Sequence, residues 1–310
     1  MKDFLDKAKA VVVGHAVADA LGVPAEFRTR EQLRNDPIRD MVGYGTHNVP
    51  LGSWSDDTSM TLCELDGIMG DTISFDVIMD NFVAWLQRGE FTPTGKMFDV
   101  GFTCNCAVLN YLSGKPYYEC GLSDERSNGN GSLMRIHPFA LFVHRMDGSD
   151  AEKIAIIEEG STLTHAHSRS KIGCGIYSFV LWELLFSPTE QSIRVGLNKA
   201  RAFYDGEAEL SHYARLFDDG FEHLPEAEIK SDGYVVSSLE AAIWCLINTA
   251  SYKECVLRAV NLGEDTDTVA AIAGGLAGAL YGYDEIPLAW RKKLLRLRLI
   301  EELCQRAFLV

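Results

Sequence analysis

Two short segments of the chain concentrate carboxylates and hydroxyls directly before apolar runs. They are Ser55-Asp56-Asp57-Thr58 and Asp265-Thr266-Asp267-Thr268. Aspartate, serine and threonine are favoured helix N-caps, and negative charge suits the positive end of a helix dipole. Capping explains one aspartate per helix better than two, because adjacent carboxylates repel each other. Oxygen donors suit Mg²⁺, Mn²⁺ or Ca²⁺, and neither segment holds the His or Cys that zinc prefers, so the alternatives are two capped helices or one shared site for a hard cation.

Three further segments offer polar groups that could act with these clusters. Glu26 follows Gly22 and Pro24, which end a predicted helix, and it is either an exposed loop acid or a general base or metal ligand. The loop Ser127-Asn128-Gly129-Asn130-Gly131-Ser132 is either a plain turn or a nest of backbone N–H groups for an anion. Thr164-His165-Ala166-His167 contains an H-x-H pair, which either ligates a metal or caps the next helix.

The elements that must position these residues are predicted to be helices. Apolar residues recur at three- and four-residue spacing, whereas alternating strand patterns are scarce. We therefore predict an all-α protein with one domain over residues 1–310. Helices are predicted over 4–21, 58–69, 75–87, 96–113, 151–163, 168–186, 190–204, 236–249, 252–261, 267–281 and 287–307. Loops are predicted over 28–54, 114–131, 205–235 and 282–287.

Small residues form a stripe on the helix predicted after the second acidic cluster. Ala270, Gly274, Gly278 and Gly282 recur every four residues. Such a stripe lets two helices approach closely, and close packing must offset the low helix propensity of glycine. We therefore expect this helix to be central. Ser74 and Ser251 are predicted N-caps, the second within a capping box that ends at Glu254.

Composition and charge exclude several classes of function. The chain of 310 residues is 47% hydrophobic and carries a net charge of −15, and its one basic run, residues 291–298, alternates with leucines. Nucleic-acid binding is therefore not expected. Neither a signal peptide nor a membrane span is expected, because charged residues interrupt the N-terminus and we find no uninterrupted apolar run of about 18 residues. Eight scattered cysteines indicate reduced thiols and a cytoplasmic protein.

The ordered set of motifs resembles the ADP-ribosylglycohydrolase family, including its bacterial enzymes that act on ADP-ribosylated dinitrogenase reductase and the ADP-ribosylarginine hydrolases. Any one motif is unspecific, but together they span about residues 14–287. The matching residues are Asp19-Ala20-Leu21-Gly22 with Pro24 and Glu26; Trp54-Ser55-Asp56-Asp57-Thr58; Phe98-Asp99-Val100-Gly101; Gly129-Asn130-Gly131 with Met134-Arg135; Thr164-His165-Ala166-His167; Gly233-Tyr234-Val235; and Gly263-Glu264-Asp265-Thr266-Asp267-Thr268.

The resemblance implies an all-α fold around a central cleft with two Mg²⁺ ions, for which Mn²⁺ is an alternative. By this match the metal ligands are Ser55, Asp56, Asp57, Asp265, Asp267 and Thr268. The residues implied in catalysis are Glu26, Asp56 and Asp267. The residues implied in substrate binding are Asp99, Asn128, Gly129, Asn130, Gly131, Ser132, His165 and Tyr234.

The implied reaction is magnesium-dependent hydrolysis of an ADP-ribosyl bond, through an oxocarbenium-like state at the ribose anomeric carbon. Glu26 or a metal-bound aspartate would take the proton of the attacking water. The implied partner is an ADP-ribosylated protein or a small ADP-ribosyl conjugate. Arginine is the favoured leaving group, because Asp99 could pair with a guanidinium.

Two alternatives remain open at this point. One is a catalytically inactive ADP-ribose-binding or crystallin-like member of the family, which loss of an aspartate from either cluster would favour. The other is a hydrolase of a different ADP-ribosyl conjugate or nucleotide. The chain departs from the family pattern at Ser55, where threonine is more common, and at Ala18, where glycine is common. The first keeps the hydroxyl, and the second bears on helix packing.

Overall fold

The computed structural model describes residues 2–308, and they fold into helices with very little strand. The strands found there form one hairpin, β1 (Ile68–Met69) paired antiparallel with β2 (Thr72–Ile73). The all-α prediction is confirmed. The helices are α1 (Lys2–Gly22), α2 (Arg30–Asn35), α3 (Asp56–Gly67), α4 (Phe75–Arg88), α5 (Phe102–Leu112), α6 (His137–His144), α7 (Asp150–Thr162), α8 (Ser168–Phe186), α9 (Glu190–Phe203), α10 (Val235–Ile247), α11 (Tyr252–Asn261), α12 (Thr266–Tyr281), α13 (Leu288–Lys293) and α14 (Leu297–Phe308).

Short 3₁₀ segments fill several of the connections. They are η1 (Val23–Ala25), η2 (Gly45–His47), η3 (Tyr117–Glu119), η4 (Leu133–Arg135), η5 (Ala208–Phe217), η6 (Phe221–His223), η7 (Glu226–Glu228) and η8 (Tyr283–Glu285). All of η5, η6 and η7 lies in the acidic segment 205–235, which was predicted as a loop. That segment therefore has local turns but no α-helix.

The largest differences from the prediction are two misplaced helix bounds and two short helices that were not predicted. The helix predicted from residue 96 begins at Phe102, which leaves residues 96–101 without regular secondary structure. The helix predicted over 287–307 breaks between α13 and α14, where Arg296 has a left-handed φ of 48°. The predicted loop 28–54 contains α2, which begins with a capping box between Thr29 and Gln32. Helix α6 was not predicted, because its eight residues are too few to establish a period.

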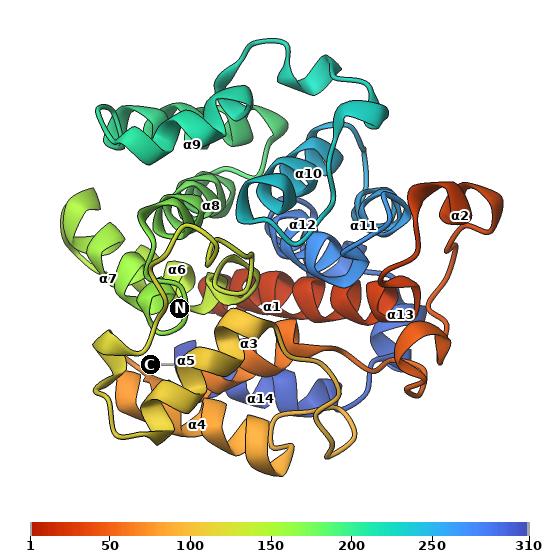
Figure 1. Cartoon of the computed structure of the whole chain (residues 1–310). Coiled ribbons are helices and arrows are strands. Elements are labelled where there is room, and N and C mark those ends of the chain that lie inside the picture. Colours follow the sequence, from red (N-terminus) through yellow and green to blue (C-terminus); the bar gives the residue numbers. More distant parts are fainter. Residues whose placement is uncertain (1, 309–310) are drawn as a thin grey trace.

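Helices α1 and α12 lie side by side at the centre of the molecule (Figure 1). Their backbones come very close: a Cβ on Gly14 would lie 2.6 Å from the Gly274 carbonyl oxygen, and one on Gly278 would lie 2.1 Å from that of Ala10. The stripe of small residues therefore allows the close helix packing that its spacing predicts, since larger side chains would push the two helices apart. Gly282 lies outside this contact and ends α12 with φ 89°.

The other helices surround this central pair. Helices α3, α4, α5 and α14 lie on one side of α1 and α8–α12 on the other (Figure 1). One cluster of buried apolar residues extends from Leu5 to Phe308. All eight cysteines are free and seven of them are buried, as predicted.

The predicted helix caps at Ser74 and Ser251 are present. The Ser74 hydroxyl accepts from the Val77 N–H, and that of Ser251 accepts from the Glu254 N–H. The Glu254 carboxylate accepts from the Ala250 N–H, one residue earlier than a capping box requires. Both helices therefore begin where the sequence predicts.

Judged only by its length and apolar composition, one segment could cross a membrane. Asp3–Ala25 contains an 18-residue window of mean hydropathy 1.3, which inspection of the sequence for uninterrupted apolar runs did not identify. In the fold 94% of that window is buried. The position of α1 at the centre of the core accounts for its apolar composition.

Candidate active site and metal centre

The carboxyl-terminal end of α1 fixes where α3 begins. Asp19 is fully buried, and its two carboxylate oxygens accept hydrogen bonds from the N–H groups of Ser55 (2.9 Å) and Thr58 (3.1 Å). The Thr58 hydroxyl also donates to Asp19 (2.5 Å). Free N–H groups at a helix start need acceptors. Asp19 thus satisfies the start of α3 from another helix, so the aspartates of α3 need not all serve as caps.

The same end of α1 fixes where α12 begins. The Thr266 hydroxyl donates to the Gly22 carbonyl (2.8 Å), and a Cβ on Gly22 would lie 2.3 Å from the Cα of Asp267. The backbone of α1 therefore touches the first turn of α12. A side chain at residue 22 would displace Asp267 from its place.

The two acidic clusters meet in space. Asp57 Oδ2 accepts from the Ser55 hydroxyl (3.0 Å) at its own helix and from the Thr268 hydroxyl (3.2 Å) at the start of α12. Asp57 Oδ1 is buried and has no hydrogen-bond partner among the residues that the structure describes. A buried carboxylate oxygen without a partner is costly, and a cation is the partner that such an oxygen suits best.

Glu26 is held beside the second cluster by the backbone of the two residues that follow it. The Phe27 N–H donates to the Glu264 carbonyl (2.7 Å), and the Glu264 N–H donates to the Arg28 carbonyl (2.8 Å). These two bonds lock the exit of η1 against the loop before α12. One oxygen each of Glu26, Asp265 and Asp267 then lie within 4.8 Å of one another. Three hard donors at this spacing could hold a metal ion.

The electrostatics of this centre favour a cation. Burial raises the pKa values of Asp56, Asp57 and Asp267 well above the ordinary value for aspartate, and neighbouring carboxylates raise them further. Burial also raises the pKa of Glu26 to about 7. Like charges crowded in a dry site retain protons unless a cation replaces them. The residues present therefore fit a hard metal ion.

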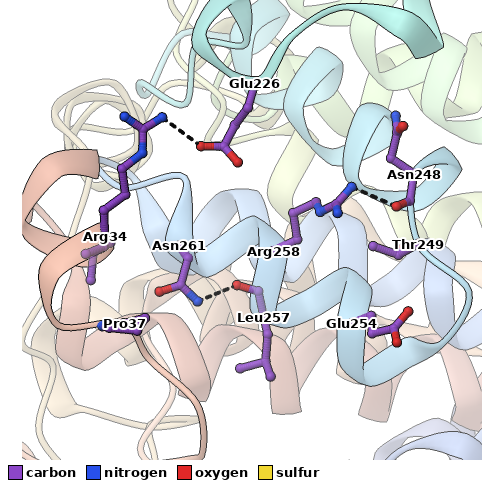
Figure 2. A pocket seen from close by; sticks show the side chains of 10 residues that line it. Arg34, Pro37, Glu226, Asn248, Thr249, Glu254, Leu257, Arg258 and Asn261 are labelled. Atoms are coloured by element: carbon purple, nitrogen blue, oxygen red, sulfur yellow. Dashed lines mark hydrogen bonds and ion pairs between the residues drawn. The ribbon is translucent and has the colours of Figure 1, made fainter.

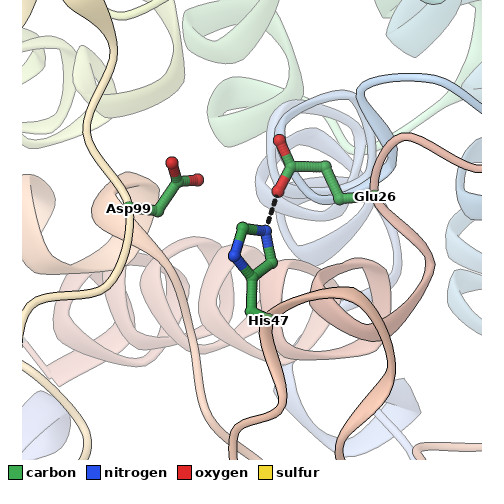
Figure 3. Close-up of side chains that lie close together, drawn as sticks. All are labelled: Glu26, His47 and Asp99. Atoms are coloured by element: carbon green, nitrogen blue, oxygen red, sulfur yellow. Dashed lines mark hydrogen bonds and ion pairs between the residues drawn. The ribbon is translucent and has the colours of Figure 1, made fainter.

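Glu26 also belongs to a second group of titratable side chains, which Figure 3 shows. His47 contacts the Glu26 carboxylate through Nε2, and Asp99 lies on the other side of the imidazole. The hydrogen bond to Glu26 raises the pKa of His47, against the effect of its partial burial. His47 comes from η2, in the segment predicted as a structureless loop, and Asp99 comes from the irregular residues before α5.

Glu26 and Asp99, but not His47, line a cleft with a volume of about 360 Å³. It contains residues from every predicted segment, so the fold brings together motifs that lie far apart in the sequence. The predicted site residues that line it are Glu26, Asp56, Asp99, Gly129, Asn130, Gly131, His165, Asp265 and Thr268. Ser55, Asp57 and Asp267 are buried at the helix starts and are absent from this lining.

Three predicted binding residues lie outside the cleft lining. The Asn128 amide donates to the Glu125 carbonyl and accepts from the Ser170 hydroxyl, and the Ser132 hydroxyl bonds to Ser161. Both side chains therefore stabilise the glycine-containing loop without lining the cleft. Tyr234 pairs with Gly129 through a backbone bridge, and its ring faces the Arg169 guanidinium at 5.9 Å.

The glycine-containing loop is not a nest of entirely free N–H groups. The Asn130 N–H donates to the Gly233 carbonyl (3.0 Å) and is therefore not available to an anion. The Asn130 side chain donates instead to Asp265 Oδ2 (2.6 Å) and to the Ser238 hydroxyl (2.9 Å). Asn130 thus links the loop to the acidic centre.

His165 and His167 have separate roles. The His167 side chain accepts from the Arg169 N–H (3.1 Å) and caps α8, as one of the two alternatives predicts. His165 is buried and reaches the cleft. The H-x-H pair is therefore not a common set of metal ligands.

A larger hollow of about 510 Å³ lies elsewhere, between α2 and α11 (Figure 2). Its polar groups are largely paired with one another: Arg34 binds Glu226, and Arg258 donates to the Asn248 carbonyl. The Asn261 amide bonds to the backbone of Ile38 and so holds the segment after α2 against α11. This hollow holds none of the predicted site residues.

The family model for ADP-ribosylglycohydrolases matches residues 1–310. The chain belongs to the ADP-ribosylglycohydrolase family. It is 34% identical to the ADP-ribosylarginine hydrolase Tri1 of Serratia proteamaculans, over 99% of this chain and 80% of that protein. It is 30% identical to the ADP-ribosyl-[dinitrogen reductase] glycohydrolase of Rhodospirillum rubrum, over 93% of this chain and 90% of that enzyme. A solved structure described as an ADP-ribosylglycohydrolase-related protein complex superposes with a TM-score of 0.82, at 27% identity and 99% coverage of both chains.

Three residues of this ADP-ribosylglycohydrolase site were not assigned a role from the sequence. Asp19 was part of a matching motif, but its contacts to the start of α3 depend on how two helices cross. His47 lies in a loop without periodicity, so no pattern marks it. Arg135 was also in a motif, and its buried ion pair with Glu64 appears only in the folded chain.

Proposed function

We propose that this protein is a magnesium-dependent hydrolase that releases ADP-ribose from a modified arginine side chain or from a small ADP-ribosyl conjugate, and that it acts in the cytoplasm. The observation that carries the proposal is the meeting of the two acidic clusters, through the Thr268–Asp57 contact, beside a cleft that Thr268 lines together with Glu26 and His165. The relatives named for hydrolysis of ADP-ribosylarginine and of ADP-ribosyl-dinitrogen reductase support the reaction class and the favoured linkage.

Two Mg²⁺ ions, or Mn²⁺ in their place, would be held by the six residues Ser55, Asp56, Asp57, Asp265, Asp267 and Thr268. When bound, the ions supply Lewis-acid chemistry that holds the ribose hydroxyls and a water molecule. The residues themselves are hard oxygen donors, and the unpaired Asp57 Oδ1 supports this assignment.

Glu26 is the proposed general base. Its pKa, raised to about 7 by burial, lets it accept a proton from water near neutral pH. His47 donates to Glu26 when protonated and so orients the carboxylate at the cleft. Asp56 and Asp267 complete the proposed catalytic set by holding the reacting groups in place.

Asp99 is proposed to receive the leaving group. It lines the same cleft and lies close to Glu26 and His47, so that a guanidinium there would meet a carboxylate partner. On the other side of the cleft, Gly129, Gly131 and His165 would contact the ADP-ribose part of the substrate.

A substrate panel tests the proposal directly. ADP-ribosyl-arginine, ADP-ribosyl-serine and O-acetyl-ADP-ribose are incubated with the protein in Mg²⁺, in Mn²⁺ and in chelator, and free ADP-ribose is measured. We expect the fastest release from the arginine conjugate and none in chelator. If no conjugate is hydrolysed while ADP-ribose still binds, the protein is instead a binding member of the family.

A further inference from the structure

A buried chain of polar contacts leads from α3 to the cleft. Glu64 and Arg135 form an ion pair in which both side chains are fully buried. Arg135 Nη2 donates to the Thr164 hydroxyl oxygen (2.7 Å), and that oxygen lies 2.8 Å from His165 Nδ1. His165 is the last member of the chain and the one that lines the cleft.

The direction of each hydrogen bond follows from the chemistry of the groups. A guanidinium can only donate, so Thr164 must accept from Arg135 and has its own proton left to give. His165 Nδ1 lies within hydrogen-bonding distance of that hydroxyl. The Cys104 thiol also lies beside it, but thiol sulfur is a weak acceptor. Nδ1 is the better acceptor of the two, so the Thr164 proton is assigned to Nδ1, which then carries a lone pair.

The backbone of His165 is held as firmly as its ring. Its N–H donates to the Ser161 carbonyl (2.8 Å), and its carbonyl accepts from the Ser161 hydroxyl (2.9 Å). The ring packs against the glycine-containing loop, where a Cβ on Gly131 would lie 2.9 Å from Cε1 and 3.5 Å from Nε2. Nε2 thus faces the loop that lines the cleft. Burial, reinforced by the Arg135 cation, lowers the pKa of His165 to about 3.

We propose that Arg135 and Thr164 are positioning residues that hold His165 as the neutral Nε2–H tautomer, so that it presents a single N–H donor to an oxygen of the bound ligand. Glu64 balances the charge of Arg135 and aims the guanidinium at Thr164. The identification of that ligand oxygen as part of ADP-ribose rests on the proposed function. The tautomer itself does not, because it follows from contacts within the protein.

The tautomer can be measured on the full-length protein with ¹⁵N-labelled histidine. Two-bond ¹⁵N–¹H correlations distinguish the two neutral forms, and a His165→Gln variant identifies the signals by their loss. We expect the unprotonated nitrogen of His165 to couple strongly only to Hε1, which marks it as Nδ1. An unprotonated Nε2, or an imidazolium at neutral pH, would overturn the proposal without any further variant.

Two substitutions at Thr164 then test the positioning role. Thr164→Val removes the hydroxyl at similar volume, and we expect loss of the single tautomer together with about ten-fold weaker ADP-ribose binding. Thr164→Ser keeps the hydroxyl and should restore both. Thr162→Val is the matched control, because the Thr162 hydroxyl bonds only to the Glu158 carbonyl nearby. Retention of the wild-type tautomer in Thr164→Val would contradict the proposal.

Failure of this proposal is distinguishable from failure of the proposed function. A protein that shows the Nε2–H tautomer and binds ADP-ribose, but hydrolyses no conjugate, retains the positioning network and loses the hydrolase assignment. A protein that hydrolyses ADP-ribosyl-arginine with His165 in the other tautomer gives the reverse result.

Discussion

The two sides of the cleft differ in charge and in how far their polar groups are paired within the protein. The acidic wall consists of Glu26, Asp56, Asp99, Asp265 and Thr268, and the neutral wall consists of Gly129, Asn130, Gly131, Met134 and His165. The carboxylates of the acidic wall raise one another's pKa values. On the neutral wall, the Asn130 amide and His165 Nδ1 already have partners within the protein.

This difference shows which half of the site the protein completes by itself. The neutral wall is preorganised by hydrogen bonds, and ligand binding requires little rearrangement there. The acidic wall crowds carboxylates together, so it is the half of the site that the proposed cations would complete. Asn130 connects the two, because its side chain donates to Asp265 across the cleft. Each prediction below changes either the neutral wall or the acidic centre, which comprises the acidic wall and the buried residues Asp19, Ser55 and Asp57, and leaves the other as a reference.

The largest effect is expected from Asp57→Asn. The change removes one charge from the acidic centre and leaves its shape, so turnover should fall on the order of a hundred- to a thousand-fold. Asp76→Asn is the matched control, since Asp76 is an exposed acid in the first turn of α4, away from the cleft. Equal activity of the two variants would mean that Asp57 is only a helix-start residue.

The second effect is a change in stability with pH and metal. Burial raises the pKa values of Asp19 to about 6 and of Glu26 to about 7, so the folded metal-free protein binds more protons than the unfolded chain in this range. The two carboxyl groups contribute this stability in full below pH 4, which is near their pKa values in the unfolded chain. The contribution is lost as the pH rises through their folded-state pKa values of about 6 and 7.

We therefore expect the metal-free protein to lose Tm between pH 5 and pH 8, and Mg²⁺ to raise Tm more at pH 8 than at pH 5. Thermal unfolding with Mg²⁺ and with chelator at each pH measures this. A Mg²⁺ effect that is the same at both pH values would argue against cation binding by the acidic wall.

A smaller effect is expected from glycine substitutions in the neutral wall. A Cβ on Gly131 would lie 2.7 Å from the Cys104 sulfur, whereas the nearest atom to one on Gly129 is 3.6 Å away. Gly131→Ala should therefore destabilise the protein by about 1–3 kcal/mol, and Gly129→Ala by less than about 0.5 kcal/mol. Denaturant unfolding compares the two. Equal losses would mean that the loop is not packed as described.

The smallest effect is expected from Ser55→Thr. The hydroxyl that bonds to Asp57 is kept and one methyl group is added, so turnover should stay within about three-fold of wild type. Ser55→Ala removes the hydroxyl and should weaken Mg²⁺ binding further than Ser55→Thr does. Titration of Mg²⁺ against activity ranks the two variants, and the opposite ranking would remove Ser55 from the acidic site.

The sequence predicts the helices better than it predicts the contacts between them. Periodicity places α11 and α8 at their observed bounds, and the stripe of Gly274 and Gly278 predicts the central position of α12. Periodicity fails for short elements such as α6. It also misplaces the start of α5, where residues 96–101 continue the apolar pattern but have no regular secondary structure.

The site is predicted where a motif carries a chemical requirement and missed where tertiary contacts create it. Two aspartates at each helix start predict a shared centre, and Asp57 does contact Thr268. His47 reaches Glu26 only because η2 packs near η1, and nothing local marks it. The buried pair of Glu64 and Arg135 has the same origin, since two ordinary charged residues become partners only in the folded chain.

The dependence of both acidic helix starts on α1 has a consequence for the order of assembly. A ribosome makes α1 first, yet the bond from Thr266 to Gly22 spans 244 residues. The contact between α1 and α12 therefore cannot form until nearly the whole chain has been synthesised. Until then the largely apolar surface of α1 lacks this partner. The proposed cation binding would then report completion of the fold, because a truncated nascent chain that lacks α12 does not contain the whole centre. An apolar helix that lacks its main packing partner during synthesis is prone to aggregation.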